Sequence, residues 1–192
     1  MTSIEAEQSD AGKQVLTKTI LLFLAAFALY FFTHSPALDE IDAVQFAMGV
    51  RSFDLLHHQP HPPGYPVFIF LGWLGTKFFH IGPASALYSV SAFGGGLFVA
   101  CWFLIIRAQF SEKFAWWIAT SLLITPVVWM TATKAVTDTL AAGLLSAELL
   151  AAIYFLEHKK LRLSICALSL EPLRRGLVRN YFRLLQSFSA FR

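Results

Sequence analysis

Five apolar runs follow one another along the chain, separated by a loop of about thirty residues after the first run and by short polar joints after the others. They cover residues 15–33, 65–79, 84–106, 114–133 and 135–156, and the third contains 23 residues without a charge. A helix needs about 20 apolar residues to cross roughly 30 Å of hydrocarbon. The pattern predicts an all-α integral membrane protein with about five transmembrane helices.

Two of these runs contain residues that change the shape of a helix. Gly94, Gly95 and Gly96 lie within the third run and predict either close approach of another helix or a local kink. Pro126 interrupts the fourth run. Because proline removes a backbone donor, this helix is expected to bend or break there.

The N-terminal segment allows two interpretations. Residues 1–14 are expected to form a cytoplasmic tail, followed by an uncleaved anchor. Lys13 and Lys18 before a short apolar core also resemble a signal peptide, with small residues at 35–37 at cleavage-like spacing. The large aromatic residues of the first run and the apolar runs behind it favour the anchor.

The charged residues only partly determine the orientation of the chain in the membrane. With a cytoplasmic N-terminus the loop 34–63 faces outward, and its one arginine among four acidic residues suits that side. Strict alternation of five spans then places Arg107, Lys113, Lys159 and Lys160 outside as well. That placement conflicts with the tendency of cytoplasmic loops to be positive.

The chain changes character near residue 160. Residues 15–160 read as one membrane module, whereas 161–192 mix arginine with serine and leucine without a full apolar span. This segment is either a basic amphipathic tail on the membrane surface or the product of a frameshift or truncation. The abrupt change favours the second interpretation, which translation of the other reading frames would test.

Composition narrows the class of protein. The chain has 192 residues, of which 56% are hydrophobic and 14% charged, against roughly 25% charged in soluble domains. An ordinary cytosolic enzyme and a disordered chain are excluded. The net charge of +3 is ordinary for a membrane protein, so no nucleic-acid partner is expected. Cys101 and Cys166 form no metal or redox pattern.

The loop 34–63 carries most of the chemistry-bearing side chains. Residues 39–51 have helical spacing, with an apolar stripe on one face and Asp39, Asp42 and Gln45 three apart on another. The stripe consists of Ile41, Val44 and Met48. The pattern predicts an amphipathic helix on the membrane surface. Asp39 is either its cap, where the helix dipole favours negative charge, or a catalytic carboxylate.

Three histidines follow this helix. His57, His58 and His61 invite a metal-site interpretation, but the prolines around them disfavour a helix and no carboxylate is spaced to complete a site. No metal is therefore predicted, and a divalent ion lacks support. Residues 62–64 (Pro-Pro-Gly) predict a rigid corner that returns the chain to the bilayer. His61 then lies at the membrane boundary, as a solvated histidine or a donor to an anionic group.

Two isolated charges interrupt the last two apolar runs. Lys134 is expected to snorkel to water. Asp138 has a short side chain that cannot reach far, so it is either turned inward for function or exposed at the membrane edge.

Taken together, three motifs resemble the glycosyltransferase C superfamily, which includes protein O-mannosyltransferases and the lipid A aminoarabinose transferase. They are the Asp39-Glu40 pair after the first span, the stretch from SFD at 52–54 to HPPGYP at 61–66, and the ATKAVTD stretch at 132–138. The similarity covers about residues 16–156 and depends on the order of the motifs.

The resemblance implies a polyprenyl-phosphate-linked sugar as donor, membrane lipid as surroundings, and transfer on the outer side of a bacterial inner membrane. It implies that Asp39 is the catalytic base or an acceptor-positioning acid, with Glu40 as the second member of the pair. His61 would help to hold the lipid phosphate, with Asp138 near the same site and Asp42 as a further substrate-binding candidate. The donor is lipid-linked, so no nucleotide-binding loop and no other cofactor are expected.

Length is the departure from this family, whose members continue through more spans. The expectation is an N-terminal fragment that is inactive unless a partner membrane subunit completes it. The alternatives are a small non-enzymatic membrane scaffold or complex subunit, and a transporter subunit. The transporter is disfavoured because the middle spans hold almost no inward charge.

Overall fold

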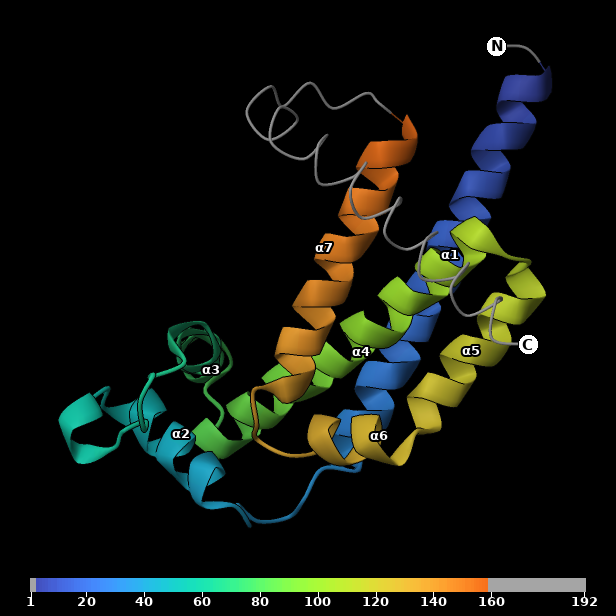
Figure 1. Ribbon diagram of the computed structural model, residues 1–192. Coiled ribbons are helices and arrows are strands. Elements are labelled where there is room, and N and C mark those ends of the chain that lie inside the picture. The colour runs from blue at the N-terminus through green and yellow to red at the C-terminus, as the bar shows by residue number, and fades with distance from the viewer. Residues whose placement is uncertain (1–2, 159–192) are drawn as a thin grey trace, which may run out of the picture. The chain divides into compact units, whose positions relative to one another are not determined.

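The computed structural model describes residues 3–158 (Figure 1), so the predictions for 161–192 lie outside the described residues. The chain divides into a unit of residues 1–153 and a second unit that begins at residue 154. The helices are α1 (Ser3–Phe32), α2 (Ile41–Arg51), the 3₁₀ turn η1 (Leu55–His57), α3 (Pro66–Phe79), α4 (Pro83–Gln109), α5 (Glu112–Ile124), α6 (Pro126–Ala132) and α7 (Asp138–His158). No strand occurs among the described residues, and the predicted all-helical class is confirmed.

The number of candidate spans is lower than the sequence pattern predicts. Segments of α1 (Asp10–Phe32), α4 (Pro83–Gln109) and α7 (Asp138–Leu156) are long and apolar enough to cross a membrane. The bent pair α5–α6 makes a fourth if it is counted as one span. The described part of the chain therefore supports three or four spans in place of five.

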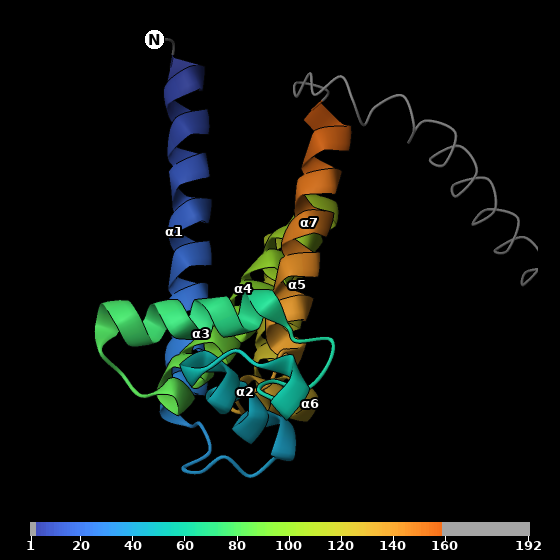
Figure 2. The same cartoon turned by 90° about the vertical axis from the view of Figure 1, so that its left-hand side faces the viewer.

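The difference is α3. Its 14 residues reach about 21 Å at 1.5 Å per residue, short of the roughly 30 Å hydrocarbon core. Figure 2 shows α3 lying crosswise to α1 and α7, and Val67, Phe70 and Phe78 on it are more than half exposed. An apolar helix of this length and direction suits the membrane interface better than a crossing.

The predicted break at Pro126 is confirmed. Helix α5 ends at Ile124, α6 begins at Pro126, and the two are bent by 57°. The last carbonyls of a helix lack a donor within it. The fully buried Tyr30 of α1 supplies one, since its hydroxyl donates to the Leu123 carbonyl at 2.8 Å. The break is thus satisfied by a side chain of another helix.

The predicted close approach at the glycine triplet is also confirmed. A Cβ added to Gly94 would lie 2.4 Å from Leu140 Cα, and one added to Gly143 would lie 2.4 Å from the Gly94 carbonyl oxygen. The Ser91 hydroxyl donates to the Val136 carbonyl at 2.8 Å beside this crossing. Helices α4 and α7 therefore meet backbone to backbone.

Two hydrophobic clusters hold the unit together. One surrounds Tyr30 and Phe103 and joins α1, α4, α5 and α6. The other surrounds Phe46 and Leu87 and joins α2, α3, the first half of α4 and the start of α7. The second cluster fixes the segments after α1 against the same end of α4 that meets the α6–α7 junction.

Helix α2 forms where predicted but packs through a different face. Its buried residues are Ala43, Phe46, Gly49 and Val50. The predicted apolar stripe is exposed, with Ile41 77% accessible. The stripe thus points away from the protein, as a helix resting on lipid would require.

Charged residues gather differently at the two ends of the helices. Lys18 of α1 forms an ion pair with Glu112, whose other oxygen lies 3.5 Å from Arg107 Nε. Glu112 begins α5 directly after α4, so α4 ends near the start of α1 and begins near the end of α1. Arg107 and Lys113 then lie at the end of Lys18, which agrees with the charge rule for these two residues, whereas Lys159 and Lys160 lie outside the described residues.

Candidate carboxylate–lysine site

The site lies where the segment after α1 meets the junction of α6 and α7. Asp39 and Glu40 directly precede α2, and Glu40 is its N-cap residue without a side-chain cap hydrogen bond. The interpretation of Asp39 as a cap is therefore wrong. The helix begins one residue too late for it, and both carboxylates have another partner.

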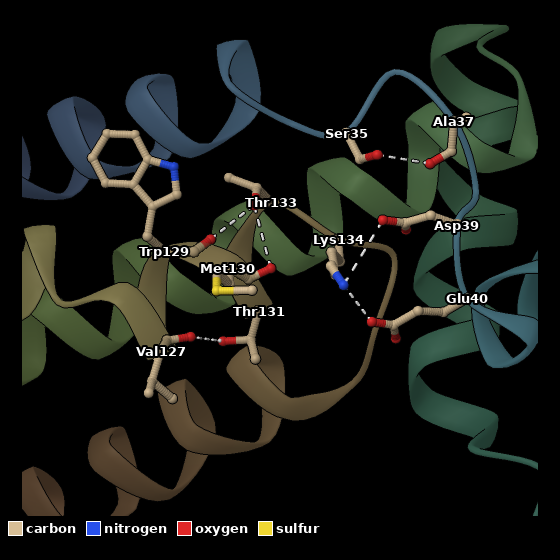
Figure 3. Close-up of polar contacts among 10 residues, drawn as sticks. All are labelled: Ser35, Ala37, Asp39, Glu40, Val127, Trp129, Met130, Thr131, Thr133 and Lys134. Carbon is tan, nitrogen blue, oxygen red and sulfur yellow. Dashed lines mark hydrogen bonds and ion pairs between the residues drawn. The ribbon is translucent and has the colours of Figure 1, made fainter.

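That partner is Lys134, between α6 and α7. Its Nζ lies 2.5 Å from Glu40 Oε1 and 3.8 Å from Asp39 Oδ2 (Figure 3). The Lys134 side chain is only 24% exposed, so the prediction that it snorkels to water is wrong. The carboxylates of Asp39 and Glu40 provide a closer counter-charge.

The electrostatics of the pair follow from this geometry. The hydrogen bond to Glu40 raises the pKa of Lys134 above its ordinary value, and the charges of Glu40 and Asp39 add to the effect. Desolvation acts in the opposite direction and is outweighed. Lys134 is therefore held as an ammonium group.

Backbone contacts hold the two segments together. The Ser35 amide donates to the Thr133 carbonyl at 3.1 Å, and the Ser35 hydroxyl donates to the Ala37 carbonyl at 2.9 Å. The Thr133 hydroxyl in turn donates to the Trp129 carbonyl at 2.9 Å. Figure 3 shows the Ser35–Ala37 and Thr133–Trp129 contacts close to Lys134. The ion pair thus sits between segments that are already fixed.

Glu40 and Asp39 are not equivalent in this arrangement. Glu40 is in direct hydrogen-bonding contact with Lys134, whereas Asp39 lies at 3.8 Å, beyond a direct hydrogen bond. The Asp39 side chain is 51% exposed. Asp39 is therefore the more exposed carboxylate and makes no direct hydrogen bond to Lys134.

A second pair lies on α2 and the turn before α3. His61 Nδ1 is 3.8 Å from Asp42 Oδ1, and the His61 ring lies between the rings of Phe46 and Tyr65, at centroid distances of 5.3 and 5.2 Å. The predicted corner is present, because the Gly64 amide donates to the His61 carbonyl at 2.9 Å. Gly64 has φ +94°, a conformation that glycine adopts without strain.

Asp138 stands apart from both pairs. It is the exposed first residue of α7 and makes no hydrogen bond or ion pair with the residues that the structure describes. The structure thus brings Asp39 to Glu40 and Asp42 to His61, and leaves Asp138 by itself.

His57 of the loop has a structural partner, Asp54. Asp54 is the N-cap of η1 and accepts from the amides of Leu56 and His57. Its Oδ2 lies 2.6 Å from His57 Nδ1, and this hydrogen bond is the main reason that the pKa of Asp54 is lowered. Within residues 3–158 no group of three or more metal-ligating side chains comes together.

Sequence reasoning missed a buried phenol beside the site. Tyr88 on α4 is 4% exposed, and its hydroxyl has no hydrogen-bond partner in the described structure. The His34 ring lies 4.6 Å from it. Nothing in the sequence marks Tyr88, whereas Lys134 is visible there as an isolated charge in an apolar stretch.

Comparison with known proteins gives a partial similarity. The chain is 33% identical over 86 residues to "Protein O-mannosyl-transferase tmem260" of Dictyostelium discoideum, and these residues are 42% of this chain and 10% of that protein. The match thus spans a tenth of the length of the relative. No family model and no solved structure matches the chain.

Proposed function

We propose that the chain carries the acidic site of a membrane glycosyltransferase, which moves a sugar from a polyprenyl-phosphate donor to an acceptor. The supporting observation is the assembly of Asp39, Glu40 and Lys134 at one end of the membrane helices. The partial similarity to an O-mannosyl-transferase and the order of the sequence motifs point the same way.

The chemistry assigned to Asp39 is general-base catalysis. As an acceptor hydroxyl forms its bond to the anomeric carbon, the bond from that carbon to the donor phosphate breaks and the phosphate leaves with the electron pair. The hydroxyl proton passes to the Asp39 carboxylate. Glu40 binds Lys134 and keeps the loop in place, so Asp39 is free for the proton.

The donor phosphate is assigned to the second pair. His61 lies one turn before α3, at the membrane interface where the phosphate of a lipid-linked donor resides. Asp42 and Asp138 are on the same end of the helices and are proposed to border this part of the site. Donors around a leaving phosphate stabilise the charge that develops on it.

The site is proposed to face the outer side of the membrane. Among the described residues, Lys13, Lys18, Arg107 and Lys113 lie at the opposite end, near the start of α1. Positive charge marks the cytoplasmic side of membrane proteins. That end is therefore assigned to the cytoplasm.

The test uses the full chain in native membranes, with polyprenyl-phosphate mannose as donor. Wild type is expected to bind this donor more tightly than the sugar-free alcohol, and Asp39→Asn should retain binding. Transfer by the membranes should fall about 10²–10⁴-fold with Asp39→Asn, the usual contribution of a general base. Asp54→Asn, a carboxylate of the same loop paired with His57, is the matched control and should leave transfer unchanged.

Two results would contradict the proposal. Failure of the wild type to bind the donor would remove the transferase assignment. Unchanged transfer by Asp39→Asn membranes would remove Asp39 as base, and would favour the scaffold alternative, in which the acidic residues only bind a partner.

A further inference from the structure

Helix α7 carries one charged side chain in the middle of a candidate membrane span. Glu148 lies ten positions after Asp138 and is the only charged residue between Thr139 and Leu156. At 1.5 Å per residue it stands about 15 Å from the start of a span that is about 28 Å long. Long lysine and arginine side chains can reach the interface from within a membrane, but a glutamate side chain is too short to do so from this depth. A charge at this position is costly unless it has a partner.

This carboxylate is on the face of α7 that points away from α4. The opposite face is buried at Leu140 and Ser146, and Gly143 packs against Gly94 of α4. At about 100° per residue, Glu148 is turned by about 140° from Gly143, and its side chain is exposed. The other exposed residues near it on this face include the apolar Leu144, Leu145 and Leu149. The outward face of α7 is therefore apolar around a single carboxylate.

Glu148 has no ionic or hydrogen-bonding partner among the described residues. Charged side chains within membrane helices almost always face other helices and pair there. The described spans offer no free base at this depth, since Lys18 of α1 is paired with Glu112. Arg107 and Lys113 stand at the ends of their helices. A second copy that docks symmetrically through the same face would bring another Glu148 and no counter-charge.

We propose that the outward face of α7 is a docking site for another membrane helix that carries one lysine or arginine at mid-depth, with Glu148 as its counter-charge. The opposite charge satisfies the carboxylate, and the exposed leucines pack against the apolar part of the arriving helix. Ala141 and Ala152 are exposed on the same face, and small residues let two membrane helices approach closely. This inference concerns association within the membrane and does not depend on the proposed function.

The probe is a transmembrane peptide of about 20 leucine and alanine residues with a single lysine at its centre. Companion peptides carry methionine or glutamate at the same position. The full chain, with a fluorescent donor on its N-terminus, is reconstituted in phosphatidylcholine vesicles at neutral pH, and energy transfer to the labelled peptide measures association. The wild type should bind the lysine peptide about tenfold more tightly than the methionine peptide, the usual scale of a polar contact between membrane helices. The glutamate peptide imitates the same face of a second copy and should bind no more tightly than the methionine peptide.

Two variants isolate the carboxylate. Glu148→Leu should bind the lysine and methionine peptides within about twofold of each other, because no counter-charge remains. Asp138→Asn is the matched control, since Asp138 is an exposed carboxylate of the same helix that lies at its first residue. It should keep the preference of the wild type for lysine.

Three results would contradict the proposal. Equal affinity of the wild type for the lysine and methionine peptides would remove the cationic partner, and this comparison needs no variant. A preference for lysine that survives in Glu148→Leu would remove the role of Glu148. Tighter binding of the glutamate peptide than of the lysine peptide would assign this face to a second copy of the chain.

Discussion

Lys134 stands between two carboxylates that come from a segment nearly a hundred positions earlier. The contact pairs three charges that adjoin the candidate membrane helices, and an unpaired charge within a membrane is costly. It also leaves one net negative charge, since two carboxylates face one ammonium group. Lys134 binds Glu40 directly, and this contact keeps Asp39 near the positive charge of Lys134 without a direct hydrogen bond to it.

Replacement of Lys134 by methionine should lower the thermal stability of the chain in detergent at neutral pH. The pKa of Lys134 is raised in the folded state, so its contribution is present below its ordinary value of 10.5 and is lost as the pH rises through the higher folded value. The difference between wild type and Lys134→Met should therefore be constant from about pH 7 to 9 and should shrink above pH 10.5.

Lys77→Met is the matched control. Lys77 is exposed on α3 and lies 5.9 Å from the Trp73 ring, without a carboxylate partner among the described residues. Equal loss of stability in both variants would show that the side-chain change, and not the ion pair, is responsible.

At this scale the sequence allowed part of the site to be predicted. Asp39, Glu40 and His61 stand out because they are polar residues close together in a short loop between apolar runs. The sequence did not identify Lys134 as the partner of these carboxylates. Lys134 reaches them only because α4, α5 and α6 return the chain to the end of α1. Tyr88 was equally hidden, because one tyrosine in an apolar helix carries no local signal.

At the scale of elements, the crossing of α4 and α7 depends on glycines, which have no side chain. Gly94 and Gly143 let the two backbones touch, and the hydroxyls of Ser91 and Thr139 form hydrogen bonds across the crossing, Thr139 to the Ser91 carbonyl at 2.9 Å. In lipid such close packing replaces the hydrophobic effect as the force between helices. The crossing also sets the position of the α6–α7 junction and hence of Lys134.

Gly94→Ala should destabilise the chain by about 1–3 kcal/mol, the usual cost of overpacking, because its Cβ would lie 2.4 Å from the Leu140 backbone. Unfolding in mixed micelles measures this. Gly12→Ala, with no atom within 4 Å of the added Cβ, should leave stability equal or slightly higher, since alanine favours helix. An unchanged free energy of unfolding in Gly94→Ala would show that α4 and α7 separate easily.

Hydropathy predicted where the helices lie but not what each one does. The run at 65–79 became α3 as expected, yet a short apolar helix can cross, re-enter or lie in the interface with the same composition. Its packing against α2 and α4 decides the direction, and that is information from distant residues. Pro126 and the glycine triplet were predictable because each acts on its own helix.

For the molecule as a whole, the course of the chain follows from the directions of its long helices. Helix α1 runs from the end that carries Lys18 to the end that carries Asp39 and Glu40. Helix α4 runs in the opposite direction, α5 and α6 together run in the direction of α1, and α7 runs in the direction of α4 (Figure 1). This places the acidic loop, Gly82 and Lys134 at one end of the helices and Arg107 with Lys113 at the other.

Single cysteines should report this arrangement in a Cys101→Ser, Cys166→Ser background. Ser52→Cys and Gly82→Cys should react with a membrane-impermeant maleimide in intact cells, whereas Ala11→Cys should react only after permeabilisation. Gly82 is exposed and an added Cβ meets no atom within 4 Å, so the change is tolerated. Protection of Gly82→Cys together with labelling of Ser52→Cys would mean that α3 crosses.

Because the paired charges are far apart in the sequence, the ion pair can form only late in the synthesis of the chain. Glu40 and Lys134 are 94 positions apart, and ribosomes add roughly 5–20 residues per second. The carboxylates thus wait roughly 5 to 20 s for their counter-charge during synthesis. During that interval Asp39 and Glu40 have no lysine partner and must remain in contact with water. The ion pair can form only after Lys134 has been synthesised.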